Sequence, residues 1–496
     1  MAYAPILPSY SKISSMNKDI SRRAFLKTLG LGGATIAVPS IIGCTGRNGD
    51  SKTSQGEIPT DKMTMRHNPH TNEDVSLLGY GCMRWPTKKE EKDGEKVDVL
   101  DQEQINRLVD FAIAHGVNYF DTSPAYCKGQ SETATGKALA RHDRSKYFIA
   151  TKLSNFTPET WSHEAGVAMF ENSLKQLQTD HIDYYLLHCI GLPTRDRQGN
   201  DLNGMEALHA RFLDNGMLDW CVEQQQKGRI RNLGWSYHGD IEVVDYLLSL
   251  HDAGKYHWDF VQIQLNYVDW KHAREINPGN TNAEYLLGEL KKRHIPAVIM
   301  EPLLGGRLAK VPEFIARNYL EREPERSIAS WAFRYAGTFP EVLTVLSGMT
   351  YMEHLEDNLR SFTPLKPLAE EEVQMLLDAA DDIVKNPFVA CNYCNYCMPC
   401  PYGIDIPSIF RHYNRCIDDG NYNHERESAE YRRARRAFLV GYDRSVPRLR
   451  QADHCIGCGE CKSHCPQRID IPAELHRIDR YAESLKTDKL QLATKE

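Results

Sequence analysis

Eight short apolar runs, each followed by a segment of helical periodicity, constrain the fold of this chain more than any other feature. Apolar spacing typical of helices marks the segments between the runs, for example residues 101–115, 164–177 and 282–293. This alternation predicts a parallel sheet, and eight such units in about 290 residues match a closed (β/α)8 barrel of the TIM type. The runs are rich in β-branched and aromatic residues and cover residues 75–81, 117–121, 147–152, 182–188, 232–236, 260–266, 297–302 and 342–347.

A doubly wound open sheet is the alternative architecture. It requires a glycine-rich turn with dinucleotide-binding spacing after its first strand. The turn Gly79-Tyr80-Gly81-Cys82 does not have that spacing, so we expect the barrel.

Polar residues stand at the ends of four consecutive predicted strands. Asp121, Lys152, His188 and Ser236 end the second to fifth strands, and Tyr126 follows in the loop after Asp121. Barrel active sites lie at the carboxyl ends of the strands. A single histidine there is usually structural, but several ionisable groups converging on one mouth indicate a catalytic site.

The residues around this mouth resemble the aldo/keto reductase family. The string YFDTSPAY at 119–126, followed by GQSE at 129–132, is similar to the family signature. Thr151-Lys152 and Leu186-Leu187-His188 stand where the family places its lysine and histidine. The resemblance covers residues 61–362 and implies a catalytic tetrad of Asp121, Tyr126, Lys152 and His188.

The chemistry of carbonyl reduction explains these residue types. A hydride added to a carbonyl leaves an alkoxide that needs a proton, and a free tyrosine with a pKa of about 10 is a poor acid or base at neutral pH. An adjacent Lys152 ammonium is expected to lower the pKa of Tyr126. Asp121 would pair with Lys152, and His188 would orient the carbonyl. The alternative is a structural Asp–Lys pair beside a core tyrosine.

The same resemblance implies a nicotinamide dinucleotide, NADH or NADPH, across the barrel mouth. Ser236 and Gln262 would contact the carboxamide, Met300 would take the stacking position, and the loop through Arg307 would cover the pyrophosphate. The segment from Ser347 would reach the adenosine. The implied cofactor-binding residues are Gly81, Ser236, Gln262, Met300, Pro302, Leu303, Gly306, Arg307, Gly348, His354, Asp357 and Asn358.

Three positions depart from the family pattern. Tyr351 stands where NADPH-dependent relatives carry a basic residue for the 2′-phosphate, and His354 replaces a frequent glutamine or arginine. Cofactor choice is therefore expected to favour NADH or to discriminate weakly. Tyr237 replaces the asparagine that often follows Ser236.

Eight of the 14 cysteines fall in two short runs. Residues 455–466, CIGCGECKSHCP, fit the bacterial ferredoxin spacing C-x-x-C-x-x-C-x-x-x-C-P. The other run, at 391–401, has a last gap one residue shorter. The segments 400–407 and 465–472, CPYGIDIP and CPQRIDIP, are an internal repeat, which predicts two related half-domains.

The repeat predicts that each run lends its last cysteine to the other 4Fe–4S cluster. One cluster would take Cys391, Cys394, Cys397 and Cys465, and the other would take Cys455, Cys458, Cys461 and Cys400. Zinc is the alternative metal, but zinc sites favour paired CxxC motifs without a proline after the last cysteine. Cys416 is expected to be a buried thiol, and Cys82, Cys127, Cys189 and Cys221 to be free thiols.

The first residues have the features of an export signal. The string SRRAFLK at 21–27 resembles a twin-arginine signal, and a short apolar stretch follows it. The string IIGC at 41–44 resembles a lipoprotein box, which would leave Cys44 as a lipid anchor. An incidental arginine pair on an amphipathic helix is the alternative. The signal predicts a periplasmic or cell-envelope location.

The expected organisation has six parts. A signal (1–44) and a linker (45–60) precede the barrel (61–365), a connecting helix (366–390), a small helical, ferredoxin-like iron–sulfur domain (391–480) and a tail (481–496). A formal charge of −7 and a pI near 6.3 give no global sign of nucleic-acid binding.

Two functions remain open. The first is a nicotinamide-dependent enzyme that reduces a small carbonyl or oxidises an alcohol, with two attached 4Fe–4S clusters. The second is an electron-transfer protein in which the clusters carry the activity and the barrel is a binding scaffold. The arginine-rich segment 432–450 would suit an acidic redox partner, or it is simply a solvated helical face. No flavin motif is present to link one-electron clusters to a two-electron hydride.

Overall fold

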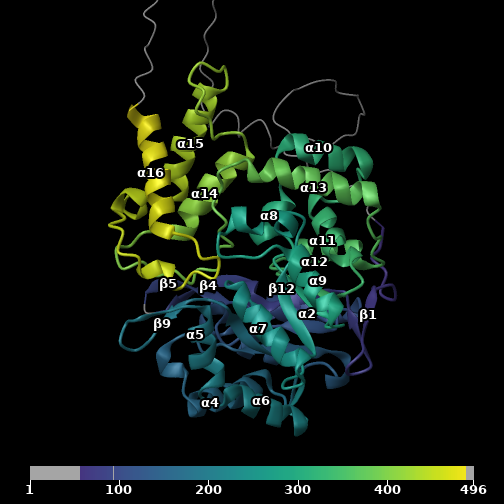
Figure 1. The fold of residues 1–496 in the computed structure, drawn as a ribbon. Coiled ribbons are helices and arrows are strands. Elements are labelled where there is room, and N and C mark those ends of the chain that lie inside the picture. The colour runs from purple at the N-terminus through teal and green to yellow at the C-terminus, as the bar shows by residue number, and fades with distance from the viewer. Residues whose placement is uncertain (1–55, 93, 488–496) are drawn as a thin grey trace, which may run out of the picture. The chain divides into compact units, whose positions relative to one another are not determined.

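Eight parallel strands close into a barrel, as the sequence predicted (Figure 1). The last strand pairs with the first, with Val345 beside Leu78, which completes the ring. The computed structural model describes residues 56–92 and 94–487. In chain order the barrel strands are β3 (Leu78–Gly81), β6 (Tyr119–Asp121), β7 (Phe148–Leu153), β8 (Ile182–Ile190), β11 (Ile230–Tyr237), β12 (Phe260–Gln264), β13 (Ala297–Met300) and β14 (Val342–Ser347).

A helix follows each barrel strand and covers its outer face. Every residue of β8 is buried, because side chains on one face fill the barrel and those on the other pack against helices. Tyr119, Tyr184 and Phe260 belong to the inner cluster. The covering helices are α2 (Gln102–Ala114), α3 (Ser131–Leu139), α4 (His163–Leu177), α6 (Met217–Gln226), α7 (Ile241–Asp252), α9 (Ala283–Lys292), α11 (Ile328–Thr338) and α12 (Met352–Phe362).

The first apolar run departs from the prediction, because it divides at Leu77. Its first half belongs to β2 (Glu73–Ser76), which pairs with β1 (Met65–Asn68) in an antiparallel hairpin, and only its second half enters the barrel. Asn68 donates to the Tyr184 hydroxyl at 2.9 Å and to Asn232 Oδ1 at 3.1 Å. The hairpin therefore covers the amino-terminal end of the barrel.

Further elements stand outside the eight repeats. A second hairpin, β4 (Thr87–Lys92) with β5 (Glu95–Leu100), follows the first barrel strand, and the sequence did not predict it. A third pairs β9 (Thr194–Arg195) with β10 (Asp201–Leu202) after the fourth strand. The remaining helices of the barrel region are α5 (Gly204–Leu208), α8 (Asp269–Ile276) and α10 (Glu313–Arg322).

The carboxyl-terminal region has its own apolar core. After α13 (Glu370–Val384), which packs on α8, come α14 (Ile406–Asp418), α15 (Tyr431–Ser445) and α16 (Ile471–Thr487) (Figure 1). Their buried faces form one cluster that includes Phe410, Phe438 and Ile478. The iron–sulfur thiols are carried on the loops before α14 and before α16.

Two predicted boundaries need correction. The helix α16 continues past residue 480 to Thr487, and Tyr481 and Leu485 are buried in the carboxyl-terminal core, so residues 481–487 are not a tail. At the other end, Ile58 packs in the barrel core although it falls in the predicted linker. The predicted signal, Cys44, and linker residues 45–55 lie outside the described residues. Among those described, no helix is both long and apolar enough to cross a membrane.

Candidate functional site

The four predicted catalytic residues meet at the carboxyl ends of strands β6 to β8. Lys152 Nζ donates to Asp121 Oδ1 at 2.6 Å and to the Thr122 carbonyl at 2.7 Å. The same ammonium lies 4.7 Å from the centroid of the Tyr126 ring, and that ring is 6.0 Å from the ring of His188. The structure therefore brings together the four residues that the sequence proposed.

His188 is held by two hydroxyls beneath the mouth. Its Nδ1 is 2.6 Å from Ser154 Oγ, which is in turn 2.9 Å from Ser123 Oγ. Arg211 donates to the His188 carbonyl at 2.6 Å and fixes the backbone there. Burial, with the nearby Lys152 charge as a smaller cause, holds the pKa of His188 well below its usual value. The imidazole is thus neutral and suited to orient an oxygen by hydrogen bonding.

The net shift of the Tyr126 pKa is upward, whereas the sequence led us to expect a lowered pKa beside Lys152. Burial raises the pKa of Tyr126 well above 10, and the charge of Asp121 raises it further. Lys152 directs its hydrogen bonds to Asp121 and Thr122 instead of to the phenol oxygen. Tyr126 is therefore a protonated phenol at neutral pH, able to donate a proton and poorly able to accept one.

The residues predicted to bind the carboxamide also form hydrogen bonds within the protein. Ser236 Oγ accepts a hydrogen bond from the Cys189 amide at 2.9 Å, and Gln262 Nε2 is 3.4 Å from Asp121 Oδ2. Asn358 donates to Ser347 Oγ at 2.8 Å, while Asp357 accepts from Ser327 at 2.7 Å. Asp357 and Asn358, which were predicted to contact the adenosine, thus form hydrogen bonds with other barrel residues.

The remaining predicted cofactor residues divide between buried and open positions. Pro302 and Arg307 are buried, Gly81, Met300 and Leu303 are half-buried, and Gly306, Gly348 and His354 are exposed. The side of the mouth near His354 is therefore open, whereas the pyrophosphate loop is partly covered.

Four of the predicted iron ligands surround one cavity. Cys391, Cys394, Cys397 and Cys465 line it together with apolar side chains that include Phe410 and Ile471. Three of these thiols come from the first cysteine run and the fourth from the second. This donor set, facing an enclosed apolar space, fits a 4Fe–4S cluster.

The other four predicted ligands form a second group. Burial, with Cys455, Cys458 and Cys400 as smaller causes, raises the pKa of Cys461 to about 12, which identifies its thiol neighbours. Cys458 is exposed, so this group lies nearer the solvent. Cys416 is buried and its Sγ lies 3.5 Å from His412 Nε2, as expected of a structural thiol.

The first thiol group lies close to the tetrad. Tyr396, between Cys394 and Cys397, is half-buried, and its buried hydroxyl has no hydrogen-bond partner among the described residues. Its charge is among the causes that raise the pKa of Tyr126, and the charges of Cys189 and Cys394 act on Tyr396 itself. The Tyr396 side chain therefore lies near both the predicted cluster and the catalytic phenol.

The carboxyl-terminal region packs on the predicted pyrophosphate loop. Arg84 donates to the Asn392 carbonyl, and Asn392 Nδ2 donates to Glu301 Oε1 at 3.1 Å. A Cβ placed on Gly305 would come within 2.9 Å of the Asn392 Cα, so the two backbones are in close contact. The loop that the family resemblance assigns to a pyrophosphate thus has a protein neighbour.

Arg307 takes part in the same contact through one nitrogen, while its Nε and Nη1 are buried without a hydrogen-bond partner among the described residues. Its guanidinium lies over the Phe388 ring, 3.5 Å from the centroid, and forms an ion pair with Asp418 at 3.3 Å. Lys310 pairs with Asp419 at 2.5 Å on the neighbouring surface. The residues present therefore do not fit a dinucleotide pyrophosphate while the carboxyl-terminal region is docked.

Two site residues were missed from the sequence. Tyr396 carried no signal, because a residue inside a C-x-x-C spacer can point to either side. His238 could have been found from the sequence, since it follows the strand-end Ser236 by two residues. Burial, with the charge of Lys152 as a smaller cause, lowers the pKa of His238 to about 4, and its Nδ1 has no hydrogen-bond partner in the described structure.

Comparisons with known proteins agree with this description. A model of the aldo/keto reductase family matches residues 77–381, and a model of a 4Fe-4S dicluster domain matches residues 390–470. Protein tas of Escherichia coli is 29% identical over 197 residues, which are 36% of this chain and 53% of that protein. L-galactose dehydrogenase of Arabidopsis thaliana is 23% identical over 66% of this chain and 96% of its own length.

Some solved structures are similar to this chain at low identity. An aldo-keto reductase of Bacillus halodurans, AKR11C1 in its holo form, is 22% identical, with a TM-score of 0.48 over 64% of this chain and 96% of its own. An aldo-keto reductase of Klebsiella pneumoniae, solved in complex with NADPH, is 21% identical, with a TM-score of 0.46 over 66% of this chain and 97% of its own.

A closed barrel with this residue set at its mouth defines an oxidoreductase class of enzyme. Within that class, the chain belongs to the aldo/keto reductase family, and it carries a 4Fe-4S domain after the barrel.

Proposed function

We propose that this protein reduces the carbonyl group of a small molecule, with Tyr126 as the proton donor, and that two 4Fe–4S clusters are part of the enzyme. The assembled tetrad carries the proposal. Asp121 holds Lys152, Lys152 lies against the Tyr126 ring, and the neutral His188 faces the same space. A carbonyl oxygen between Tyr126 and His188 would receive the phenol proton as charge develops on it.

The pKa of Tyr126 affects how well the site catalyses each direction of the reaction at neutral pH. Because burial raises that pKa, the phenol stays protonated at neutral pH and serves as the acid in reduction. Alcohol oxidation needs the phenolate as a base, so it is disfavoured until the pH is high. This site therefore favours reduction over oxidation at neutral pH.

The clusters are proposed from the two thiol groups. Reduction of a carbonyl to an alcohol consumes two electrons and two protons. Each 4Fe–4S cluster normally holds one exchangeable electron, so two clusters together hold the two electrons; Tyr126 would give the proton to oxygen, and the carbon would take its proton from solvent when no hydride donor is bound. The resemblance implies NADH or NADPH as the hydride source. No step is drawn through the dinucleotide, because the docked region covers the loop that would hold its pyrophosphate.

Replacement of the phenol tests the proposed acid. Tyr126→Phe should retain the fold and the iron content and lose about 100- to 10,000-fold in turnover. Small aldehydes, ketones and sugars are the substrates to try, with NADH, NADPH and reduced methyl viologen as electron donors. Tyr335→Phe is the matched control, because Tyr335 is a buried tyrosine on α11 whose hydroxyl has no partner in the described structure. Wild-type turnover by Tyr126→Phe would refute the assignment.

An electron-transfer role for the whole protein is the second candidate. The solvent-exposed arginines of α15, Arg432, Arg433 and Arg436, offer a basic surface for an acidic redox partner. This role predicts cluster reduction by a partner protein that is salt-dependent and unaffected by Tyr126→Phe.

Location is proposed from the sequence alone. The twin-arginine string predicts export of the folded, cluster-loaded protein to the periplasm or cell envelope, with Cys44 as a possible lipid anchor. Replacing Arg22 and Arg23 by lysine should retain the protein in the cytoplasm. Equal export of the variant would contradict the signal.

A further inference from the structure

The pyrophosphate part of the predicted dinucleotide site is where the carboxyl-terminal region packs. Glu301 connects the two sides, since its Oε2 accepts from the Gly305 amide at 2.6 Å and its Oε1 from Asn392 at 3.1 Å. On the other side of Asn392, Arg84 donates to its carbonyl while packing on Gly348. Asn392 therefore lies between the loop after β13 and the end of β14, where the pyrophosphate is expected.

Arg307, the cation expected to face the pyrophosphate, forms an ion pair with a carboxylate of the protein instead. Arg307 is nine-tenths buried, with Asp418 as its ion-pair partner and Phe388 against its flat face. The Asp418 carboxylate accepts from Arg307 Nη2 and would repel a diphosphate brought to this guanidinium, although Nε and Nη1 have no hydrogen-bond partner among the described residues. Two more contacts hold the docked region around the rim: Arg468 pairs with Asp240 at 2.9 Å, and Gln264 Nε2 is 3.4 Å from Gln467 Oε1.

We propose that the iron–sulfur region takes the place of a nicotinamide dinucleotide on this barrel, so that the docked protein binds neither NADH nor NADPH tightly. The proposal does not rest on Tyr126 being the acid. Two sequence features agree with it. Tyr351 supplies no cation for a 2′-phosphate, and an exported protein works apart from the cytoplasmic NAD(P)H pool.

Dinucleotide binding by the cluster-loaded protein tests the proposal directly. Fluorescence titration of NADH and NADPH under anaerobic conditions should show no tight binding to the wild type. Asp418→Ala/Asp419→Ala removes the partners of Arg307 and Lys310, which should loosen the docking and strengthen dinucleotide binding by about tenfold or more. Glu427→Ala/Glu483→Ala is the matched control, because it removes the same charge from residues outside the contacts with the barrel and should leave binding unchanged.

The outcomes separate clearly. Micromolar binding of either dinucleotide by the wild type, with full iron content, would overturn the proposal. Equal affinities for the wild type, the interface variant and the control would also overturn it, unless the variant lost its iron. The wild-type titration then decides alone, because it needs no variant to fold.

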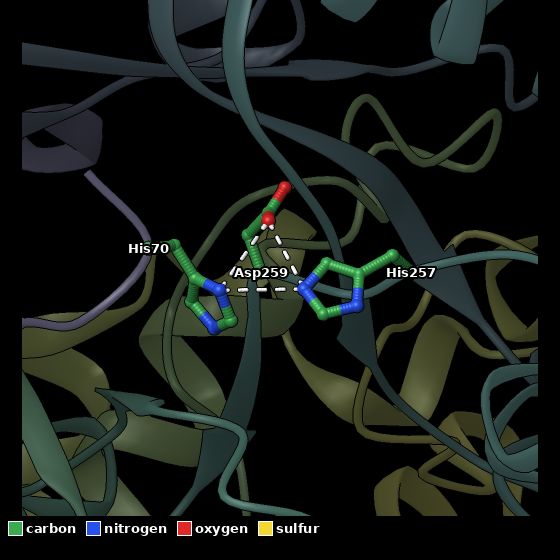
Figure 2. Close-up of side chains that lie close together, drawn as sticks. All are labelled: His70, His257 and Asp259. Atoms are coloured by element: carbon green, nitrogen blue, oxygen red, sulfur yellow. Dashed lines mark hydrogen bonds and ion pairs between the residues drawn. The ribbon is translucent and has the colours of Figure 1, made fainter. Parts of the chain in front are cut away.

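An independent observation lies at the opposite end of the barrel. His70, in the turn between β1 and β2, and His257 converge on one oxygen of Asp259 at the start of β12 (Figure 2). His257 Nε2 is 3.3 Å from His70 Nδ1 and 3.5 Å from Asp259 Oδ1, and His70 Nδ1 is 3.8 Å from that oxygen. Ligands about 2.0–2.2 Å from a tetrahedral zinc ion are separated by about 3.3–3.6 Å, so the three atoms nearly have the spacing of one coordination shell.

The surroundings of Asp259 support a bound cation. Its other oxygen, Oδ2, accepts from the Leu233 amide at 2.7 Å and from Gln225 at 2.5 Å, which leaves Oδ1 directed at the two imidazoles. Such hydrogen bonds to the second oxygen commonly orient a metal-binding carboxylate.

The geometry points to a zinc-type divalent metal site made by His70, His257 and Asp259. Two imidazole nitrogens and one carboxylate oxygen suit Zn²⁺. The position is structural in character, since the amino-terminal end of a barrel is remote from the chemistry. Metal here would tie the β1–β2 hairpin to the barrel strands.

Zinc content tests the second proposal. The cluster-loaded protein, dialysed anaerobically against Zn²⁺ with its cysteines occupied by iron, should retain one more zinc ion than His70→Gln or His257→Gln. His67→Gln is the control, because His67 is an exposed histidine in the same hairpin that contacts Asp74. Zinc should also raise the thermal midpoint of the wild type and of the control and leave both site variants unchanged. Equal zinc retention by all four proteins, or none by the wild type, would overturn the assignment.

Discussion

Removing the ammonium from the Asp121–Lys152 pair is expected to destabilise the barrel in a pH-dependent manner. Lys152 is fully buried and Asp121 is 2% exposed, so Lys152→Met leaves a carboxylate without its cation in a desolvated site. Removing one partner of a buried pair typically costs about 3–5 kcal/mol. The lost donor to the Thr122 carbonyl adds about 1 kcal/mol.

The pH dependence follows from the pKa of Asp121. Burial already raises this pKa above its usual value, while Lys152 lowers it, so the variant should have a still higher pKa. A carboxyl with a raised pKa in the folded state binds more protons there than in the unfolded state. Stability is therefore lost as the pH rises from the unfolded pKa of about 3.9 to the folded pKa, by up to about 1.4 kcal/mol per pH unit.

Thermal unfolding followed by far-UV circular dichroism at pH 5.5 and pH 8 measures this effect. The thermal midpoint of Lys152→Met should fall further below the wild type at pH 8 than at pH 5.5. Lys152→Met/Asp121→Asn, which removes both charges, should recover most of the loss at pH 8. An equal deficit at both pH values, or no recovery in the double variant, would show that Asp121 is not a buried carboxylate dependent on Lys152.

Three further predictions concern the clusters, His188 and the carboxyl-terminal core. Cys400→Ser should damage the cluster held by the second cysteine run and Cys465→Ser the cluster held by the first, as seen by electron paramagnetic resonance of the reduced protein; the reverse pattern would refute cross-ligation. Ser154→Ala removes the hydroxyl at His188 Nδ1 and should lower turnover about tenfold with iron content unchanged, because the ring loses its orientation; unchanged turnover would assign Ser154 no positioning role. Phe438→Ala, a deletion in the core of helices α14 to α16, should cost about 3–5 kcal/mol and release iron at a lower temperature than the barrel unfolds; simultaneous loss of iron and barrel would contradict a separate core.

The barrel and its catalytic residues could be predicted because both depend on local patterns. Parallel strands buried on both faces appear as short apolar runs, and the residues just after them share one end of the sheet. The hairpin at residues 87–100 could not be predicted, because its first strand, TKKEEK, is entirely polar. The split at Leu77 was missed because both halves of that run are apolar.

The grouping of the cysteines could be predicted from the sequence, whereas the docking of the carboxyl-terminal region on the barrel could not. Cys391 and Cys465 were placed together because the internal repeat implies a twofold relation. The packing of Asn392 on Gly305 depends on two surfaces far apart in the chain, and nothing near either residue indicates it. The unexpected pKa of Tyr126 has the same origin, since Tyr396 and the covering region come from the other end of the protein.

The position of iron relative to the tetrad tests the account most directly. Crystals grown anaerobically and measured at the iron absorption edge should show anomalous density among Cys391, Cys394, Cys397 and Cys465, with the Tyr396 side chain near both that density and the Tyr126 ring. Density held by Cys391, Cys394, Cys397 and Cys400 alone, or a cluster remote from the barrel mouth with Tyr126 open to solvent, would contradict the account.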